Sequence, residues 1–147
     1  MYKIFLLISL IFSSVFAQVD ANLEIIKKAN SLPKILVSVA SNASELETLN
    51  KVKKSLVEDL GVSRHFELAT TNSQARYEDI PDIISLSNQG VSLFLNLSAQ
   101  KESSGDYTLM IKLYDINARA LILEKNFTTS QEERYVFLAH KAAISIN

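Results

Sequence analysis

Few side chains in this sequence are of types that could do chemistry, and their spacing does not assemble a reactive centre. The chain has two histidines, three glycines and no cysteine. His65 stands at the start of an expected strand and His140 lies in an expected helix, and neither has a second histidine at the spacing of a metal site. The absence of cysteine excludes thiol catalysis, cysteine-bound zinc and disulfides. We therefore expect each imidazole to be partly buried and hydrogen-bonded to the backbone.

Four pairs of acidic residues are the remaining candidates for acid–base catalysis, because a carboxyl group with a raised pKa could serve as an acid or a base. Each pair lies at an expected helix end or on an expected polar face, where solvated carboxylates interact favourably with the helix dipole. The sequence contains no glycine-rich phosphate loop and no Gly-x-Ser-x-Gly nucleophile motif. The pairs are Glu45/Glu47, Glu58/Asp59, Asp79/Asp82 and Glu132/Glu133.

These observations predict no catalytic residue, no metal, no cofactor and no small-molecule substrate, and hence a protein that is not an enzyme. A small hydrolase that uses the carboxylates of Asp79 and Asp82 is an alternative. The chain has 15 basic and 16 acidic residues, and its lysine pairs are isolated rather than gathered in a block. Electrostatic binding to nucleic acid or to an anionic bilayer is therefore not expected.

One motif could carry a covalent modification. Asn126, Phe127 and Thr128 form an Asn-x-Thr sequon, and Glu124 stands two positions before the asparagine. This acidic form resembles the acceptor of some bacterial N-glycosylation systems. A strand end within a β-meander explains the same residues equally well. Asn126 is therefore a candidate glycosylation site, and both interpretations stay open.

The first residues have the pattern of a cleavable export signal. Lys3 provides a positive charge, residues 4–12 are largely apolar, and Val15-Phe16-Ala17 places a small residue at the cleavage point. The apolar run covers about 13 residues, whereas a helix needs about 20 to cross a bilayer. We expect residues 1–17 to be a signal peptide and the mature protein to begin near Gln18 in the periplasm. No stable membrane insertion is expected after cleavage.

The first half of the mature chain alternates strand and helix patterns. Residues 19–25 alternate apolar and polar side chains, which predicts a strand with one buried face. Residues 34–40 form a β-branched run, typical of a strand covered on both faces. Ser44 and Glu47 have the spacing of a capping box that opens a helix, and Gly61 is expected to end it. The expected buried stripe of this helix is Leu46, Leu49, Val52, Leu56 and Leu60.

The middle of the chain predicts a weak strand at residues 65–69 and a surface loop at residues 70–78. Pro81 suits the first turn of a short helix, because proline lacks the N–H that would be unpaired there, and Gly90 is expected to end that helix. The residues that would form its buried face are Ile80, Ile83 and Ile84.

The last part of the chain predicts a meander followed by a helix. Residues 91–99, 107–113 and 121–123 have β character and are joined by short turns, which indicates three antiparallel strands. Ser130 and Glu133 repeat the capping-box spacing at the start of the final helix. Its expected apolar stripe is Tyr135, Leu138, Ala139, Ala142 and Ile146.

Together these elements predict one domain over residues 18–147 with an α/β fold. Helices separated by strands come first and a meander follows. This order is typical of a mixed β-sheet with a C-terminal antiparallel meander, covered by about three helices.

Several short segments match, in order, the pattern of a known family. They are residues 23–28 with 32–35, Gly90-Val91 before a strand, Gly105-Asp106-Tyr107 at a hairpin, Leu113-Tyr114-Asp115 in the next strand, and Arg134-Tyr135 with Ala139-His140 in the last helix. Over nearly all of the mature chain the sequence therefore resembles the N-terminal α/β domain of the TolB family.

The resemblance implies a periplasmic subunit of the Tol-Pal envelope system, which supports outer-membrane integrity and invagination during cell division through protein–protein contacts. In that family the α/β domain precedes a six-bladed β-propeller that carries most contacts to the lipoprotein Pal, and the N-terminal segment of the mature chain engages TolA. Here that partner-binding segment would consist of Gln18, Val19, Asp20, Ala21, Asn22, Leu23, Glu24 and Ile25.

Two interpretations of this segment stay open. A strand with an open edge can add to a partner's sheet, which would explain TolA-like binding. Alternatively, residues 19–25 pair inside this domain, and the two arrangements could alternate.

The chain also departs from the family pattern. It stops at Asn147 without a propeller, and it has Ile144 and Ser145 where the family often has an aspartate. We expect either a fragment of a longer protein or a free-standing domain. The alternative to a Tol-Pal component is a periplasmic interaction module of another envelope assembly.

Overall fold

A computed structural model describes residues 31–147 of the chain. The predicted signal peptide, residues 1–17, and the predicted strand at residues 19–25 lie outside the described residues. The described elements, in chain order, are β1 (Lys34–Val39), α3 (Leu46–Ser63), β2 (Glu67–Leu68), α4 (Ile83–Asn88), β3 (Leu93–Lys101), β4 (Tyr107–Asp115), β5 (Ala120–Thr129), a 3₁₀ turn η3 (Glu132–Arg134) and α5 (Tyr135–Ile146).

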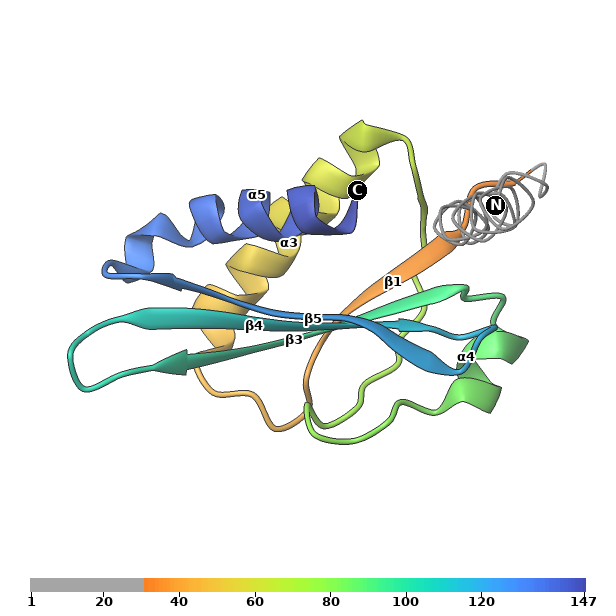
Figure 1. Ribbon diagram of the computed structural model, residues 1–147, viewed down its shortest axis with the longest axis horizontal. Coiled ribbons are helices and arrows are strands. Elements are labelled where there is room, and N and C mark those ends of the chain that lie inside the picture. The colour runs from red at the N-terminus through yellow and green to blue at the C-terminus, as the bar shows by residue number, and fades with distance from the viewer. Residues whose placement is uncertain (1–30) are drawn as a thin grey trace, which may run out of the picture. The chain divides into compact units, whose positions relative to one another are not determined.

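The five strands form one mixed sheet in the order β2-β1-β3-β4-β5. β1 runs parallel to both β2 and β3, and the crossovers between these strands contain α3 and α4. β3, β4 and β5 are antiparallel neighbours joined by short turns. The predicted α/β class, with a mixed sheet and a C-terminal meander, is therefore confirmed (Figure 1).

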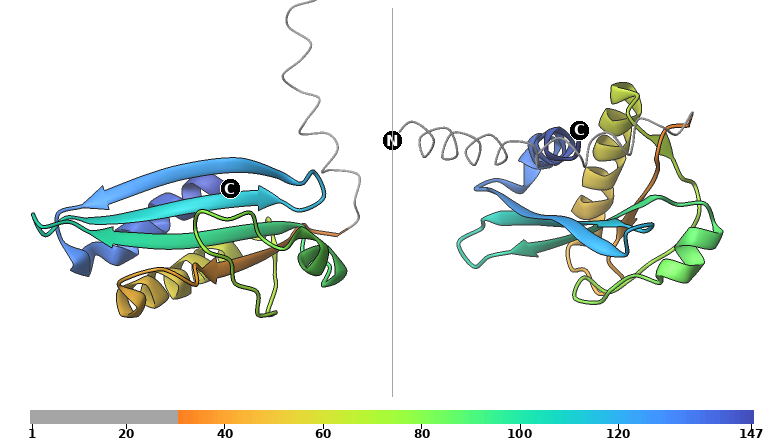
Figure 2. Two further views of the ribbon diagram at one scale, coloured as in Figure 1. Left: turned by 90° about the horizontal axis from the view of Figure 1, so that it is seen from below. Right: turned by 45° about the vertical axis from the view of Figure 1, so that its right-hand side comes forward.

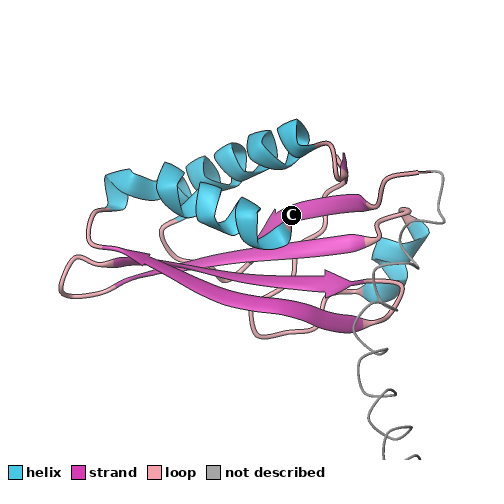
Figure 3. Ribbon diagram, turned by 45° about the horizontal axis from the view of Figure 1, so that its top comes forward, coloured by secondary structure: helices cyan, strands magenta, loops and turns pink. Residues whose placement is uncertain are grey.

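Helices α3 and α5 lie side by side on one face of the sheet (Figures 1 and 3). Alternate residues of β4 point toward these helices and are buried, because side chains on a strand change face at every position. The main core therefore lies between the sheet and the helix pair. The strand residues that form it include Ile35, Val37, Leu95, Leu97, Leu109, Ile111 and Leu113.

The long helix α3 buries four of the five residues predicted for its apolar stripe, but its ends differ from the prediction. Leu46 is half exposed and starts the helix rather than packing in the core. The predicted capping box is wrong, because the Ser44 hydroxyl donates instead to the backbone carbonyl of Ala99 in β3, at 3.0 Å. Gly61 does not end the helix, which continues to Ser63. Arg64, with φ of 57°, takes the left-handed position that was expected of Gly61.

The short helix α4 begins later than predicted. Pro81 precedes the helix instead of occupying its first turn. Asp82 is the N-cap residue, and its carboxylate accepts a hydrogen bond from the Ser85 N–H at 3.0 Å.

The buried face of α4 differs from the prediction as a result. Ile80 and Ile84 were predicted to be buried and are instead exposed, at 76% and 72%. Ile83, the third predicted residue, is partly buried and packs against the smaller core of the second face. Leu86, which was not predicted, is fully buried in that core.

Gly90 ends α4 as predicted, with φ of 72°. Its N–H donates to the Ser87 carbonyl at 2.9 Å, and the N–H of Val91 donates to the Leu86 carbonyl at 3.0 Å. These two bonds satisfy the last carbonyls of the helix in the manner of a left-handed C-terminal turn, which glycine adopts without steric cost.

The final helix α5 packs as predicted through Leu138, Ala139 and Ala142, but it does not start as predicted. The capping box of Ser130 and Glu133 does not form, because a 3₁₀ turn intervenes and the helix begins only at Tyr135 without a side-chain cap.

The second face of the sheet carries a smaller core at one end and a long loop across its middle. The core contains Leu36, Leu86, Val91, Phe94, Tyr114 and Ile116. The loop of residues 69–82 runs across the strands on the side opposite α5, as the view from below shows (Figure 2, left). The predicted loop at residues 70–78 is thus correct in type, and it also covers part of the sheet.

Candidate functional site

The two sites predicted from the sequence lie in different parts of the chain. The partner-binding segment, residues 18–25, lies outside the described residues. Asn126 lies on β5, the last strand of the sheet order, and its side chain is exposed.

The two histidines make contacts that differ from the prediction. Nδ1 of His140 lies 2.5 Å from the Asp59 carboxylate, so α5 and α3 are joined by a side-chain pair. Nδ1 of His65 lies 3.3 Å from Oδ1 of Asn147. Both imidazoles are exposed and bond to side chains of other segments, so the expectation of partly buried rings bonded to the backbone was wrong. Asp59 and Asp82, from two of the acidic pairs, each hold a structural contact.

No three histidine, aspartate or glutamate side chains within residues 31–147 lie close enough together to hold a metal ion. Over the same residues, no helix is both long enough and apolar enough to cross a membrane.

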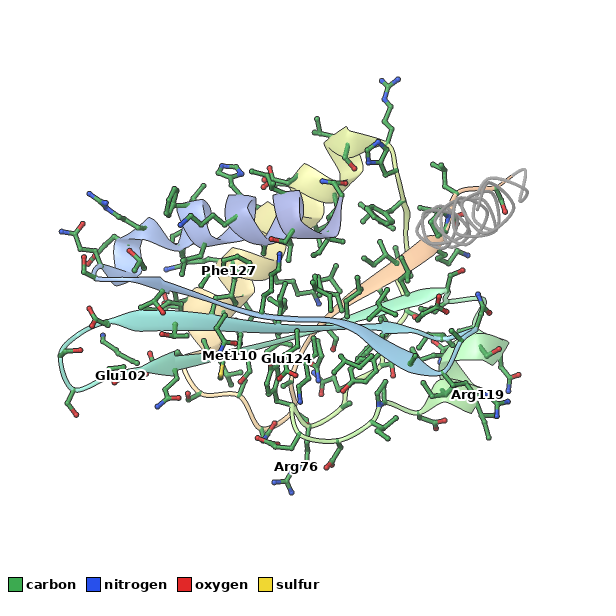
Figure 4. All side chains as sticks on the ribbon, in the orientation of Figure 1. Arg76, Glu102, Met110, Arg119, Glu124 and Phe127 are labelled. Carbon is green, nitrogen blue, oxygen red and sulfur yellow. The ribbon has the colours of Figure 1, made fainter. Side chains whose placement is uncertain are left out.

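The most developed polar arrangement is a row of four side chains across the second face of the sheet. Ser38, Asn96, Lys112 and Glu124 stand opposite one another on β1, β3, β4 and β5, as the strand register requires. We call these four residues the polar row. Figure 4 labels Glu124 and Met110 on this side of the sheet and Phe127 on the helix side. Because of this register, one polar side chain from each of the four strands lies next to the polar side chain of the neighbouring strand.

The polar row binds the backbone of the loop that crosses it. The Ser38 hydroxyl donates to the Ser73 carbonyl at 2.7 Å. Nδ2 of Asn96 donates to the carbonyls of Ala75 and Arg76 at 3.4 and 3.3 Å. The Ala75 carbonyl also accepts from the Ser41 N–H at 3.0 Å, and the Arg76 carbonyl from the Asp79 N–H at 3.3 Å. The row therefore adds side-chain donors that attach this irregular, partly exposed segment to the sheet.

Lys112 completes this set of contacts at Tyr77. Its Nζ donates to the Tyr77 carbonyl at 3.2 Å and lies 4.6 Å from the centroid of the Tyr77 ring. Its ammonium group is also 3.8 Å from the Glu124 carboxylate. The ammonium group of Lys112 therefore contacts a backbone carbonyl, the face of an aromatic ring and an exposed carboxylate.

Three titratable groups at the edge of this site, Tyr77, Tyr114 and Glu78, have shifted pKa values. Burial, with the nearby negative charge of Glu124, raises the pKa of Tyr77. The pKa of Tyr114 is raised for the same reasons. A backbone N–H, together with the Nδ2 of Asn42 at 2.8 Å, lowers the pKa of Glu78. The tyrosines stay neutral and the carboxylate stays ionised, which suits structural contacts better than proton transfer.

Two buried polar atoms of this site make no hydrogen bond within the part of the chain that the structure describes. They are the Tyr77 hydroxyl and Oδ1 of Asn96. The polar row was not among the sites predicted from the sequence. Its only sequence signal is a polar residue between apolar neighbours, as at Asn96 and Lys112, and that signal equally predicts a solvent-exposed face.

A shallow hollow of about 340 Å³ lies between α4 and the turn that joins β4 to β5. Arg119, labelled in Figure 4, stands at this turn. The other residues that line the hollow are Ile83, Ile84, Ser87, Asn88, Ile116 and Asn117. This lining combines isoleucine side chains with amide, hydroxyl and guanidinium groups, and it contains no carboxylate or histidine that could form an acid–base pair.

Comparison with known proteins gives one consistent relationship. No family model matches the chain. It is 37% identical over 136 residues to the Tol-Pal system protein TolB of Wolinella succinogenes, which covers 92% of this chain and 32% of that protein. It is 33% identical over 145 residues to TolB of Helicobacter hepaticus, covering 96% of this chain and 33% of that protein. The chain thus spans about a third of the length of these relatives.

Solved structures share the fold. The crystal structure of TolB from Acinetobacter baumannii matches with a TM-score of 0.62 at 18% identity, over 80% of this chain and 28% of that one. PelC from Paraburkholderia phytofirmans, described as a dodecamer, matches with a TM-score of 0.52 at 11% identity, over 76% of this chain and 86% of that one. Sequence identity over about nine-tenths of the chain, together with this shared fold, identifies it as a homologue of the TolB proteins of the Tol-Pal system, corresponding to their N-terminal domain.

Proposed function

We propose that the chain is a periplasmic, non-enzymatic component of a Tol-Pal system that acts through protein–protein contacts. In this role it supports outer-membrane integrity and invagination during cell division. The observation that carries the proposal is the sequence identity to TolB proteins over nearly the whole chain. The described residues add physical support for a structural role, because Lys112 attaches the loop to the sheet and the His140–Asp59 pair joins α5 to α3.

We propose that residues 18–25 bind a TolA-like protein. Their alternation of apolar and polar side chains suits a strand, and an added strand gains backbone hydrogen bonds along a partner's sheet edge. Side chains at every second position would then give specificity. A Pal-like protein is the second proposed partner.

The partner assay is capture of the periplasmic C-terminal domain of TolA by the purified exported chain. We expect deletion of residues 18–25 to abolish capture. The midpoint of thermal unfolding should stay unchanged, because the main core lies within Leu32–Asn147. Undiminished capture by the deletion variant would reject this segment as the partner-binding site.

Two matched point variants make the test sharper than the deletion alone. Leu23→Asp places a charge at a predicted apolar position of the segment, and we expect it to weaken capture at least tenfold. Leu32→Asp introduces the same charge at a half-exposed position outside the segment, and capture should be unchanged. Equal losses in both variants would indicate a nonspecific effect of charge and would contradict the proposal.

Export and envelope function are tested separately. Cell fractionation should find the chain in the periplasm, with its N-terminus near Gln18. Disruption of the coding sequence in the native host should increase detergent sensitivity and leakage of periplasmic proteins. Retention in the cytosol with residues 1–17 attached would refute the export proposal.

A second candidate is an interaction module of a different envelope assembly. The match to PelC, described as a dodecamer, covers 86% of that chain, so a fold of this kind can make up almost a whole self-assembling protein. A periplasmic chain that captures neither TolA nor Pal, and whose disruption leaves the envelope intact, would favour this candidate.

A further inference from the structure

We propose that Asn126 is the acceptor of an N-linked oligosaccharide, transferred from a polyprenyl-diphosphate carrier onto the folded domain. This modification goes beyond the proposed function and uses different residues. The chain offers its own internal comparison, since its sequence contains three Asn-x-Ser/Thr sequons. They begin at Asn42, Asn96 and Asn126.

Only the sequon at Asn126 combines an acidic flank with a free, accessible amide. The residue two positions earlier is Glu124 for Asn126, but Ala40 for Asn42 and Phe94 for Asn96. The acidic residue at that position therefore distinguishes one sequon from the other two by sequence.

The accessibility of the three asparagine side chains also distinguishes Asn126 from Asn42 and Asn96. Asn96 is fully buried, and its Nδ2 is bonded to the loop carbonyls. Asn42 is exposed, but Nδ2 donates to Glu78 at 2.8 Å and Oδ1 accepts from the Tyr77 N–H at 3.0 Å. Asn126 is exposed, and its side chain makes no hydrogen bond within residues 31–147. The Asn126 amide can therefore reach a transferase without breaking a contact of its own.

The strand geometry presents the recognition residues together. Glu124, Asn126 and Thr128 occupy alternate positions of β5, so their side chains project from one face, opposite the helices. An enzyme approaching that face meets the acid, the acceptor and the hydroxyl in a single row. The intervening Lys125 and Phe127 point to the helix side, where Phe127 packs on the core.

The contacts that hold the two flanking residues are weak ones. Oγ1 of Thr128 lies 2.9 Å from Oγ1 of Thr108 in an exposed pair. The Glu124 carboxylate is half exposed and 3.8 Å from Nζ of Lys112. Exposed contacts of this kind contribute little to stability, so exchange for contacts with an enzyme is easy. β5 ends the strand order of the described sheet, which leaves its outer backbone edge open to the same enzyme.

The reaction is a substitution at the anomeric carbon of the donor sugar. Nδ2 of Asn126 forms a bond to that carbon as the bond from the carbon to the diphosphate oxygen breaks. The polyprenyl diphosphate leaves with the electron pair, and one amide proton passes to a base of the transferase. No oxidant or reductant takes part. The product is a bulky, solubilising group on the edge strand.

The test incubates the purified full chain with a bacterial oligosaccharyltransferase that prefers acidic sequons and with a polyprenyl-diphosphate-linked oligosaccharide. We expect the intact mass to rise by one oligosaccharide, and tandem mass spectrometry should locate it on Asn126. Because the assay uses purified components, its result does not depend on whether the export or partner proposals hold.

Variants at Asn126, Glu124 and Thr128 test which side chains the transfer requires. Asn126→Gln should abolish transfer, and Glu124→Gln should reduce it at least tenfold. Thr128→Val, which keeps the shape of the side chain and removes the hydroxyl, should also abolish it, whereas Thr128→Ser should retain it. The circular dichroism of each variant checks that the domain has folded.

A free peptide with the sequence Glu-Lys-Asn-Phe-Thr is the control for accessibility. Modification of both the peptide and the folded domain at Asn126 supports the proposal. Modification of the peptide alone would overturn it, because the fold would then block the site. Transfer to Asn42 or Asn96, or transfer that persists in Asn126→Gln, would overturn it as well.

Discussion

Replacement of Lys112 by methionine should destabilise the domain, because the ammonium group of Lys112 holds the loop that crosses the sheet. Nζ donates to the Tyr77 carbonyl at 3.2 Å and lies 4.6 Å from the centre of the Tyr77 ring. Methionine has a flexible, unbranched side chain of similar length, so the packing of the lysine stem is largely kept. The substitution thus removes the charge and the donor with little change in volume.

The size of the effect follows from three contributions. A buried acceptor left without its donor costs about 1–3 kcal/mol. Loss of a cation over an aromatic ring costs about 0.5–2 kcal/mol, depending on how far the pair is desolvated. The Lys112 side chain is only 15% exposed, so removal of its charge also returns part of the free energy spent on desolvation. We expect a net fall of about 2 kcal/mol in the free energy of unfolding.

The assay is urea unfolding at pH 7, followed by circular dichroism, with native-state hydrogen exchange as a local probe. The midpoint should fall without a change in the slope, because the folded surface is the same in both proteins. The amides of residues 73–77 should exchange faster, since the loop loses one of its attachments to the sheet.

Glu124→Gln is the matched control, because it removes the carboxylate that pairs with Lys112 and leaves the contacts of Lys112 with the loop in place. The Glu124 side chain is 53% exposed and the ion pair is 3.8 Å long, so the loss should be below about 0.5 kcal/mol. A Lys112→Met variant as stable as the wild type would refute the reasoning. So would a Glu124→Gln variant that reproduces the whole loss, since the exposed ion pair would then be the stabilising contact.

Two further predictions concern the same loop. Asn96→Asp should lose at least about 3 kcal/mol at pH 7, because a buried carboxylate would face the carbonyls of Ala75 and Arg76. Burial raises the folded-state pKa of such a group, so its penalty should shrink as the pH falls; urea unfolding at pH 7 and pH 5 that gave the same loss relative to wild type would contradict this. Asn42→Ala should raise the pKa of Glu78 toward its ordinary value of 4.5, as followed by NMR titration of the side-chain carboxyl. Because the folded-state pKa of Glu78 is lowered, its contribution to stability is present above pH 4.5 and is lost as the pH falls through that lowered pKa. The variant should therefore show a flatter decline of stability below pH 4.5, and an unchanged Glu78 titration would argue against the contact.

The existence of the three meander strands could be predicted, and β3 and β4 carry their signal within a few residues. β5 was predicted only over residues 121–123, whereas it runs from Ala120 to Thr129, because most of its side chains are exposed and show no apolar alternation. The apolar positions of β4 alternate with polar or half-exposed ones, and the structure buries them under the helices as that alternation requires. The boundaries moved by two residues at β3, where the prediction began at Val91 and the strand begins at Leu93. The end of a strand depends on where its neighbour stops pairing, and that is not a local property.

Helix ends were predicted less well, for a physical reason visible at Ser44. Its hydroxyl could cap a local N–H or bond to a carbonyl elsewhere, and the sequence spacing reveals only the first option. The fold brings the Ala99 carbonyl within 3.0 Å, and that bond takes the hydroxyl. Similarly, Gly61 is free to adopt a left-handed conformation but remains helical, and a Cβ added there would approach Leu68 to 3.3 Å.

The sequence by itself determined the fold class and the family relationship, because both depend on the order of apolar patterns along the chain. It also marked Asn126 through the acidic sequon of residues 124–128. The tertiary structure alone revealed the polar row, since Ser38, Asn96 and Lys112 become neighbours only when three strands adopt one register. It likewise decided which sequon is accessible. Periodicity is a local property that a sequence displays directly, whereas a hydrogen bond between distant segments exists only after their strands have paired.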